Sequence, residues 1–350
     1  MLHMKEPQNI TYLFGAGASC QALPVVNRIS KELEHFSGIL RSHTFNGQSE
    51  GTPNEQIKEE LLQTLAEILV GIEDFGTIDG YARQLWLNKK FSQLIKFKAA
   101  ISLYFTVRQL GPPGIFMVDD RNFFQQIDRR YYPLLAKYMN QGNSGPVLPS
   151  NINVLTWNYD FQIELALMKI HNLEYASEVF DIVDIIPDLT HKNLLRGQIL
   201  HLNGIAGAYN VESGMYSHIY NRHSKSAEFG DIIEKCIFVY QSAVRESISF
   251  QQTFAFAWEN SAVSQLAITN AKQILSATDI FVIIGYSFPD YNRDVDRELI
   301  NSMNLNASSK MIFYQDPSAN EIDLVEMFDL LEFVPNYRTN CSKFLIPAGY

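Results

Sequence analysis

The fold of this chain is decided by the stretch Asp279-Ile280-Phe281-Val282-Ile283-Ile284-Gly285-Tyr286-Ser287. The five residues after Asp279 are β-branched or aromatic, which predicts a strand buried on both faces, and the glycine ends that strand. A second run of this kind opens the chain, where Ile10-Thr11-Tyr12-Leu13-Phe14 stops at Gly15. Strands that are apolar throughout are typical of parallel sheets covered by helices.

Outside these two runs, short apolar stretches alternate with longer segments of helical period. Further strands are expected at residues 152–156, 198–202, 311–314 and 331–334. Helices are expected to begin near residues 161 and 320, and to span about residues 229–250, 262–277 and 294–303. This alternation predicts an α/β fold, a Rossmann-like parallel sheet that carries helices on both faces.

A long helical segment interrupts the alternation after the first strand and its helix. From residue 55 to residue 141 nearly all of the sequence has a helical period, with a break at Gly111-Pro112-Pro113-Gly114. Two apolar stripes mark its helices, one of Leu61, Leu65, Ile68 and Leu69, the other of Leu94, Phe97, Ile101 and Phe105. We therefore expect a sheet-forming domain of residues 1–36 and 146–350, with residues 37–145 as a large helical insertion after the first βα unit.

Composition restricts the possible classes of protein. With 46% hydrophobic and 19% charged residues, the chain of 350 residues resembles an ordinary globular protein. A formal net charge of −10 offers no basic face to a phosphate backbone, so direct nucleic-acid binding is not expected. The N-terminal sequence has no signal-peptide pattern and no apolar segment approaches ~18 residues, so we expect neither secretion nor a membrane span.

The three cysteines, Cys20, Cys236 and Cys341, are far apart in the sequence. They provide neither a disulfide framework nor a Cys-x-x-Cys pair for zinc. We therefore expect a cytoplasmic protein without a zinc site.

The carboxyl ends of the expected strands carry glycine or polar residues, and open parallel sheets bind ligands at those ends. After the first strand, Gly15-Ala16-Gly17-Ala18-Ser19 would let the backbone approach a pyrophosphate, which the N–H groups at the next helix start would receive. A glycine turn after a strand also serves tight helix packing, roughly as often. The run lacks the third glycine and the later acidic residue of the dinucleotide fingerprint, which disfavours a dehydrogenase.

Three other strand ends carry polar or glycine residues, and each of these has a structural explanation. Asn158 and Asp160 follow the second strand, but Asp160 is also a typical N-cap and Asn158 a typical turn residue. His201 ends another strand, where a histidine is commonly a hydrogen-bonded structural group. Gly285 and Ser287 also fit a plain strand exit. The order of these features along the chain is more specific than any one of them.

In that order the motifs resemble the sirtuin-like family. The family's Gly-Ala-Gly-x-Ser phosphate loop and downstream proline are matched by Gly15-Ala16-Gly17-Ala18-Ser19 and Leu23-Pro24. Its Thr-x-Asn-x-Asp motif is matched by Thr156-Trp157-Asn158-Tyr159-Asp160, and its catalytic histidine segment resembles Leu200-His201-Leu202-Asn203-Gly204. Its late glycine-serine loop, in the form seen in bacterial defence members, is similar to Gly285-Tyr286-Ser287-Phe288-Pro289-Asp290. The resemblance runs from Thr11 to about Asp316 and leaves out the helical insertion.

The differences from the family are informative. Protein-deacylating sirtuins carry two Cys-x-x-Cys pairs between the histidine segment and the late loop, where this chain has only Cys236. Many members have glutamine at Trp157, sirtuins proper have glycine at Leu202, and their phosphate-loop arginine has only Arg28 as its equivalent. Loss of the zinc module removes part of the acyl-lysine groove. The resemblance is thus to zinc-less bacterial members with a helical insertion, which look like NAD-destroying effectors of anti-phage defence.

This resemblance implies an NAD+ glycohydrolase that releases nicotinamide and ADP-ribose, with NAD as substrate and without zinc. It implies that Asn158 holds the ribose or the attacking water, that His201 accepts a proton, and that Asp160 orients the ribose. The phosphates would be held by Gly15, Ala16, Gly17, Ser19, Pro24 and Arg28, and the adenosine side would be covered by Gly285, Tyr286 and Ser287. Two rivals stay open, namely a sensor module that binds NAD or ADP-ribose without turnover, and an NAD-dependent deacylase or ADP-ribosyltransferase.

An effector that depletes NAD has to be silent in healthy cells, so its activity is expected to depend on assembly or on a partner. The helical segment holds more apolar residues than one stripe needs, namely Trp86, Phe91, Leu94, Phe97, Tyr104 and Phe105. They form either a homo-oligomer surface or part of the core. A defence-system partner protein, such as an ATPase or a sensor, is the other expected regulator.

Overall fold

A single parallel sheet forms the centre of the molecule. The computed structural model describes residues 8–25, 28–45, 52–112, 115–116, 126–142, 145–186, 196–211, 216–218, 228–245, 250–259, 261–303, 310–322, 324–328 and 335–348. Within them, the seven strands of this sheet are β1 (Ile10–Phe14), β4 (Ile152–Thr156), β5 (Asp184–Ile186), β6 (Gln198–His201), β10 (Ile280–Ile284), β11 (Met311–Gln315) and β12 (Asn336–Arg338). Their order is β12-β11-β10-β1-β4-β6-β5, and all neighbours are parallel. The predicted Rossmann-like α/β fold is confirmed.

The first strand of the chain lies in the middle of the sheet. Ile10 of β1 pairs with Ile152 on one side and with Ile280 on the other. The chain therefore adds β4, β5 and β6 on one side of β1 and later adds β10, β11 and β12 on the opposite side. Such a reversal is the switch point at which open α/β sheets bind ligands, beyond the carboxyl ends of the strands. The glycine loops and the polar candidates follow β1, β4, β6 and β10, which flank this point.

Alternate residues of the buried strands face opposite sides of the sheet, as the period of two requires. On β1, Tyr12 and Phe14 join one large core, whereas Leu13 joins a smaller one. On β10, Val282 and Phe281 divide in the same way. We call the side of the large core the insertion face and the opposite side the α9 face.

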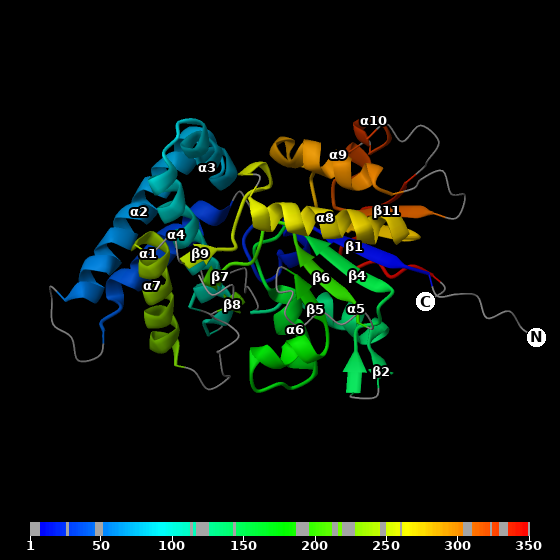
Figure 1. Cartoon of the computed structure of the whole chain (residues 1–350), viewed down its shortest axis with the longest axis horizontal. Coiled ribbons are helices and arrows are strands. Elements are labelled where there is room, and N and C mark those ends of the chain that lie inside the picture. The colour runs from blue at the N-terminus through cyan, green and yellow to red at the C-terminus, as the bar shows by residue number, and fades with distance from the viewer. Residues whose placement is uncertain are drawn as a thin grey trace, which may run out of the picture.

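Helices cover both faces of the sheet (Figure 1). On the insertion face lie α5 (Tyr131–Tyr138) and α6 (Gln162–Ile170), whose apolar residues belong to the large core. On the α9 face lie α8 (Ala262–Ala277), α9 (Arg293–Asn301) and α10 (Leu324–Phe328). Helices thus shield both faces of the sheet from water, which explains why the sequences of these strands are apolar throughout.

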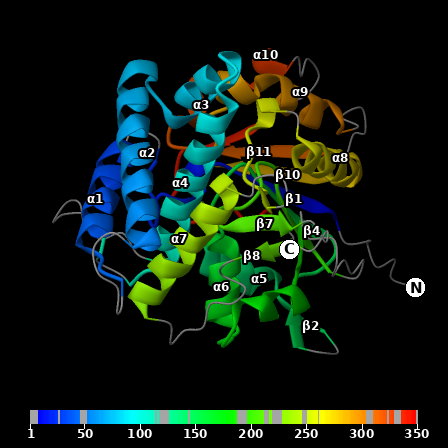
Figure 2. The same cartoon turned by 60° about the vertical axis from the view of Figure 1, so that its left-hand side comes forward.

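A block of helices stands beside the sheet (Figure 2). Four of its helices lie between β1 and β4 in the sequence: α1 (Ile29–Ser42), α2 (Pro53–Phe75), α3 (Ile78–Leu87) and α4 (Phe91–Leu110). A fifth, α7 (Phe229–Arg245), comes from the chain after β6 and packs along α4. The boundaries of the insertion at residues 37 and 145 stay a prediction.

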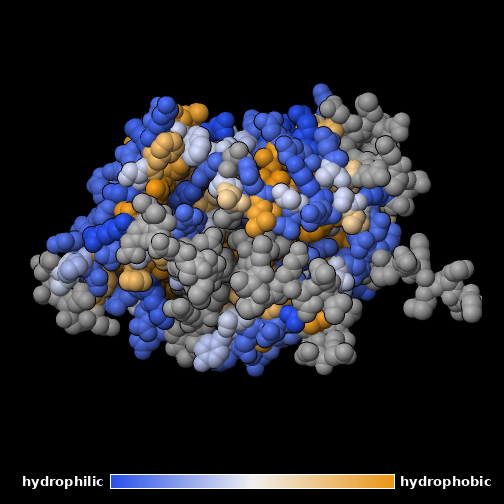
Figure 3. Space-filling view, viewed as in Figure 1, coloured by the Kyte–Doolittle hydropathy of each residue, from blue (hydrophilic) through white to orange (hydrophobic). Residues whose placement is uncertain are grey.

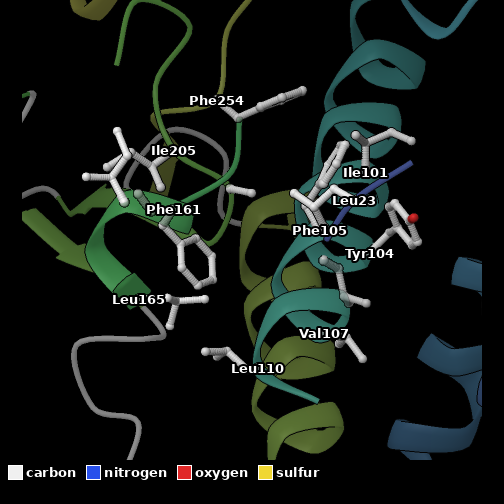
Figure 4. Close-up of a cluster of buried hydrophobic side chains, with 14 of the residues drawn as sticks. Leu23, Ile101, Tyr104, Phe105, Val107, Leu110, Phe161, Leu165, Ile205 and Phe254 are labelled. Atoms are coloured by element: carbon white, nitrogen blue, oxygen red, sulfur yellow. The ribbon is translucent and has the colours of Figure 1, made fainter. Parts of the chain in front are cut away.

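Helix α4 joins this block to the sheet through one continuous core. Its second half, from Ala99 to Leu110, is buried on all sides, so no single apolar stripe describes it. Figure 4 shows Phe105 of α4 and Phe161 at the start of α6 within the same cluster of buried side chains. The insertion is therefore rigidly attached beside the carboxyl end of β4.

Several short strands differ from the expectations. A hairpin is formed by β2 (Asn140–Gly142) and β3 (Gly145–Val147), and an antiparallel sheet by β7 (Ala208–Val211), β8 (Tyr216–His218) and β9 (Phe250–Gln252). None of these strands was expected, and the helix expected to reach residue 250 ends at Arg245. Strands of three or four residues are too short to show a period. The strand expected at 331–334 lies outside the described residues.

Candidate functional site

A chain of buried polar side chains lies on the insertion face, at the carboxyl ends of β1, β4 and β6. The Asn158 amide donates to the Gly15 carbonyl at 2.9 Å and to the Ser19 hydroxyl at 3.4 Å. The Ser19 hydroxyl lowers the pKa of the Asp160 carboxyl from close by, and Asp160 in turn lies within electrostatic reach of His201. None of these side chains is more than 8% exposed. The structure therefore gathers Asn158, Ser19, Asp160 and His201 into one cluster.

The strand register explains why these residues share a face. Thr156 of β4 pairs with His201 of β6, so the two side chains point to the same side of the sheet. Asn158 follows two residues after Thr156, and its backbone N–H donates to the Thr156 hydroxyl at 3.0 Å. Trp157, between them, is buried in the core of the α9 face.

Asp160 forms a local turn bond as well as belonging to the cluster. Its Oδ1 accepts the backbone N–H of Gln162 at 3.1 Å, two residues further on. The N-cap of α6 is Phe161, so Asp160 is not the N-cap that its type and position suggested. Burial raises the pKa of this carboxyl to about 6, although the bonds from Ser19 and Gln162 lower it. Near pH 7 the group is mostly ionised, so a negative charge lies beside His201.

His201 has a partner that the sequence analysis did not consider. Its Nε2 lies 2.6 Å from Oε1 of Glu164 on α6, and the two side chains are 1% and 0% exposed. Glu164 follows Asp160 by one helical turn and so shares its face, which was a usable signal in the sequence. Among the described residues, Nδ1 of His201 and Oε2 of Glu164 have no hydrogen-bond partner. No direct hydrogen bond between His201 and Asn158 occurs there either, and the link runs through Ser19 and Asp160.

The two glycine loops pack against each other. The Gly17 N–H donates to the Gly285 carbonyl at 2.9 Å. A Cβ on Gly15 would lie 2.5 Å from the Gly285 oxygen, and one on Gly285 would lie 2.5 Å from the Gly17 carbonyl carbon. Gly285 also has φ +62, which favours glycine. The contact between the loops therefore requires these glycines, and their role in holding phosphates stays a prediction.

A buried ion pair from the segment before α5 braces the first glycine loop. Arg130 donates to the Gly17 carbonyl at 2.7 Å and pairs with Asp128 at 2.7 Å. Asp128 also accepts the Gln21 backbone N–H at 3.1 Å. This brace was missed because nothing near residue 130 in the sequence points to residue 17. It fixes the position of the loop relative to the polar cluster.

A second polar cluster lies on the α9 face, below the late glycine loop. Asp296 of α9 accepts the indole N–H of Trp157 at 3.0 Å on one oxygen and the Tyr286 hydroxyl at 2.8 Å on the other. Burial raises the pKa of Asp296 to about 7, although these two bonds lower it. Asn292 donates to the Tyr286 hydroxyl at 3.1 Å. The Tyr286 ring is thus committed to this cluster, and its backbone carbonyl accepts a hydrogen bond from the Tyr314 hydroxyl at 3.1 Å.

The other candidate residues differ in exposure. Ala16 and Ser287 are exposed, one at the tip of each glycine loop. Arg28 is exposed at the start of α1, and Pro24 is buried. A ligand at this edge of the sheet would meet Ala16 and Ser287 first.

Helix α3 contacts the segment that follows the carboxyl end of β4. The Tyr159 hydroxyl donates to Asp79 at 3.0 Å, and burial raises the pKa of Asp79 to about 6. Arg83, one turn later, lies 5.7 Å from the ring centroid of Trp258 and 5.5 Å from that of Tyr291. Stacking on aromatic rings therefore replaces the i,i+4 ion pair that the spacing of Asp79 and Arg83 would allow.

The apolar residues considered for an oligomer surface belong mostly to the core. Four are buried: Leu94, Phe97, Tyr104 and Phe105. Trp86 is partly covered by Trp258, and Phe91 is 49% exposed. In the space-filling view, polar residues interrupt the apolar surface of the helical block (Figure 3). The homo-oligomer stays a prediction.

Two searches of the described part of the chain concern metals and membranes. No group of three His, Cys, Asp or Glu side chains is placed there to hold a metal ion. None of the helices described has the length and the apolar character that crossing a membrane requires.

Comparisons with known proteins show only a distant similarity, between this structure and solved structures. No family model and no curated protein sequence matches the chain. The structure is similar to Sir2 in complex with the inhibitor EX-527, 2'-O-acetyl-ADP-ribose and deacetylated p53 peptide, at 11% identity and a TM-score of 0.38, over 95% of this chain and 87% of that one. It is also similar to Sir2 with p53 peptide and NAD+, at 12% identity and a TM-score of 0.37, with the same coverage. The fold class rests on the strand order of the sheet.

Proposed function

We propose that this chain is a sirtuin-like NAD+ glycohydrolase, which cleaves the bond between nicotinamide and ribose. The observation that carries the proposal is the buried cluster in which Ser19 and Asp160 link Asn158 to His201 beneath the first glycine loop. Nicotinamide is already a cationic leaving group in NAD, so its departure needs stabilisation of a positive sugar and a placed water more than a strong acid. The cluster supplies an amide, a carboxylate and an imidazole for these tasks.

Each residue of the cluster has a role in the proposed reaction. Asn158 holds the ribose or the attacking water, and Asp160, mostly ionised near pH 7, favours the positive charge that develops on the sugar. His201 accepts a proton from that water or from a ribose hydroxyl. Water adds to the anomeric carbon as the bond to nicotinamide breaks, so NAD+ and water give ADP-ribose, nicotinamide and one proton.

The glycine loops hold the rest of the substrate in this proposal. The first loop binds the phosphates through Gly15, Ala16, Gly17 and Ser19, with Pro24 and Arg28 after it, and the late loop of Gly285, Tyr286 and Ser287 covers the adenosine. Asn158 and His201 are 8% and 1% exposed beneath these loops. We therefore propose that the substrate moves the loops away from the cluster as it binds.

Nicotinamide release by purified protein tests the role of the cluster. We expect Asn158→Ala and His201→Gln to lower the rate of release from NAD by about 100-fold or more, since each removes a group that acts on the ribose. Asn203→Ala is the matched control, because Asn203 is also a buried amide at this edge and donates to the Trp157 carbonyl at 3.1 Å. Equal rates for the wild type and all three variants would overturn the role assignment.

Two other outcomes would support the rival functions. NAD that stays bound and intact after long incubation with the wild type would make the chain a sensor module. Loss of NAD that depends on an added acyl-lysine or protein acceptor would make it a deacylase or an ADP-ribosyltransferase. Free ADP-ribose formed without any acceptor would exclude both.

We further propose that the enzyme acts in the cytoplasm of bacteria as an effector of anti-phage defence and depletes NAD when it is triggered. The sequence motifs of its late loop support this role. We expect cellular NAD to fall after phage infection in cells that carry the wild type with its partner, and to stay constant with His201→Gln.

Light scattering after size-exclusion chromatography tests the proposed homo-oligomer, and a strict monomer at micromolar concentration would contradict it.

A further inference from the structure

The contact between Glu164 and His201 is the closest polar contact in the candidate site. Nε2 of the imidazole and Oε1 of the carboxyl are 2.6 Å apart, and both side chains are almost wholly buried. A buried carboxylate is costly unless it accepts hydrogen bonds, and this imidazole is the partner that the structure provides. The proton of a neutral His201 therefore lies on Nε2, where it is donated to Glu164.

The second ring nitrogen is left in a different state. Nδ1 of His201 has no hydrogen-bond partner among the described residues, although it is buried. With the proton on Nε2, Nδ1 carries a lone pair and is the only ring atom that accepts a proton. A buried acceptor without a partner is uncommon in folded proteins, and a catalytic role is one of the explanations for it.

The fold places two carboxyl groups around this imidazole. Asp160 lies just before α6 and Glu164 lies in its first turn, and His201 ends the strand that neighbours β4. Glu164 contacts Nε2, whereas Asp160 interacts with the ring only through its charge and is bonded by Ser19 and Gln162. The two carboxyls thus differ in their contacts. Glu164 orients the ring, whereas Asp160 lies with Ser19 and Asn158, the residues proposed to meet the ribose.

We propose that Glu164 is a positioning residue that holds His201 in the Nε2–H tautomer and so makes Nδ1 the nitrogen that receives the proton in the reaction. The assignment of the tautomer stands on the geometry alone. Its effect on rate rests on the proposed NAD cleavage. When Nδ1 takes a proton from water or from a ribose hydroxyl, the Glu164 carboxylate stabilises the imidazolium through the same Nε2–H bond.

The test combines a spectroscopic readout with a rate. Long-range proton–nitrogen spectra of histidine-labelled protein, assigned with His201→Gln, report which ring nitrogen carries the proton near neutral pH. We expect the Nε2–H tautomer in the wild type. In Glu164→Gln we expect a mixture, because a carboxamide both donates and accepts, whereas Glu164→Asp should keep the wild-type tautomer in part.

The rate of nicotinamide release should follow the tautomer. We expect kcat to fall roughly 100-fold in Glu164→Gln with KM changed less than about threefold, and to recover in part in Glu164→Asp. Glu32→Gln is the control for loss of a buried carboxylate, since Glu32 is 1% exposed and pairs with Arg108 away from the cluster. Its kcat should stay at the wild-type value.

Two results would overturn the proposal, and a third separates it from the proposed function. An Nδ1–H tautomer in the wild type would contradict it, as would a Glu164→Gln variant whose tautomer and kcat both match the wild type. A wild-type protein that releases no nicotinamide would remove the proposed reaction, while the spectra would still decide whether Glu164 sets the tautomer.

Discussion

The two faces of the sheet carry different polar clusters at the same edge. On the α9 face, both oxygens of Asp296 have partners, and so do the Trp157 indole and the Tyr286 hydroxyl. On the insertion face, Nδ1 of His201 and Oε2 of Glu164 have none among the described residues. The neighbours Trp157 and Asn158 belong to opposite clusters, although both lie in one short motif.

This difference separates a cluster that stabilises the fold from one prepared for chemistry. Folded proteins satisfy nearly all of their buried polar groups, and the exceptions gather at functional sites, where the local rules are broken for a purpose. We therefore expect the α9-face cluster to contribute mainly to stability. The cluster of the insertion face should contribute mainly to activity, with little net gain in stability. The glycine loops, which lie between the two, should be sensitive to any added atom.

The largest effect is expected at the contact between the glycine loops. Gly285→Ala places a Cβ 2.5 Å from the Gly17 carbonyl carbon at a φ of +62. Left-handed strain and overpacking together should lower the free energy of unfolding by about 2 to 5 kcal/mol. Urea denaturation measures this loss, with Gly38→Ala in α1 as control, since nothing lies within 4 Å of the added atom there. An unchanged midpoint for Gly285→Ala would show that the loops do not pack as described.

The next effect concerns the satisfied cluster. Asp296→Ala leaves the Trp157 N–H and the Tyr286 O–H buried without an acceptor, which should cost about 3 kcal/mol of unfolding free energy. The same denaturation experiment measures it. Nicotinamide release by the folded fraction should stay near the wild-type rate. A loss of activity without a loss of stability would reverse the roles that we assign to the two faces.

The pH dependence of stability should distinguish the faces as well. The pKa of Asp296 is raised to about 7 and that of Asp160 to about 6, each from 3.8. A carboxyl whose pKa is raised by folding holds its proton in the native state, so stability is highest below the unfolded pKa and falls as pH rises to the folded pKa. Between pH 6 and pH 7 the loss due to Asp296 should be about 1 kcal/mol, because its carboxyl in the native state goes from mostly protonated to half protonated over this interval.

Asp296→Asn checks this assignment, because it removes the titration and keeps an oxygen that accepts hydrogen bonds. Its free energy of unfolding should be flatter than that of the wild type between pH 6 and pH 7. Below pH 6 only the part of the slope that comes from other raised carboxyls, such as Asp160 and Asp79, should remain. Parallel curves over the whole range would place the proton elsewhere.

The smallest effect is expected where the functional pair is removed altogether. Glu164→Leu combined with His201→Leu replaces a buried polar pair by apolar side chains, which should change the free energy of unfolding by less than about 1 kcal/mol. Each single substitution leaves a buried polar group without its partner and should cost more, about 2 kcal/mol. A strongly destabilised double variant would show that this pair, like Asp296, mainly holds the fold together.

The sequence predicted the parts of the fold that carry a local pattern. The bounds of β1, β4 and α8 agree with the expectation, because apolar runs and a helical period extend over enough residues to be read. The edge strand β5 and the small sheet of β7, β8 and β9 were missed, since three or four residues show no period.

The sequence predicted which residues lie together at this edge, but it did not predict which of them contact one another. Asn158, Ser19, Asp160 and His201 do gather, because strand ends of a parallel sheet share an edge. The partner of His201 depends on which side of α6 meets β6, and this is a property of packing. Tyr286 shows the opposite case: its motif position suggests a ligand, whereas its ring faces Asp296.

The position of β1 between two strands from much later in the chain has a consequence for synthesis. The Asn9 backbone N–H bonds Asp279, which is 270 residues further on, so the N-terminal strand lacks its second neighbour until most of the chain has left the ribosome. Nascent chains expose that strand and have no closed glycine loops. The proposed NAD cleavage would therefore become possible only near the end of translation.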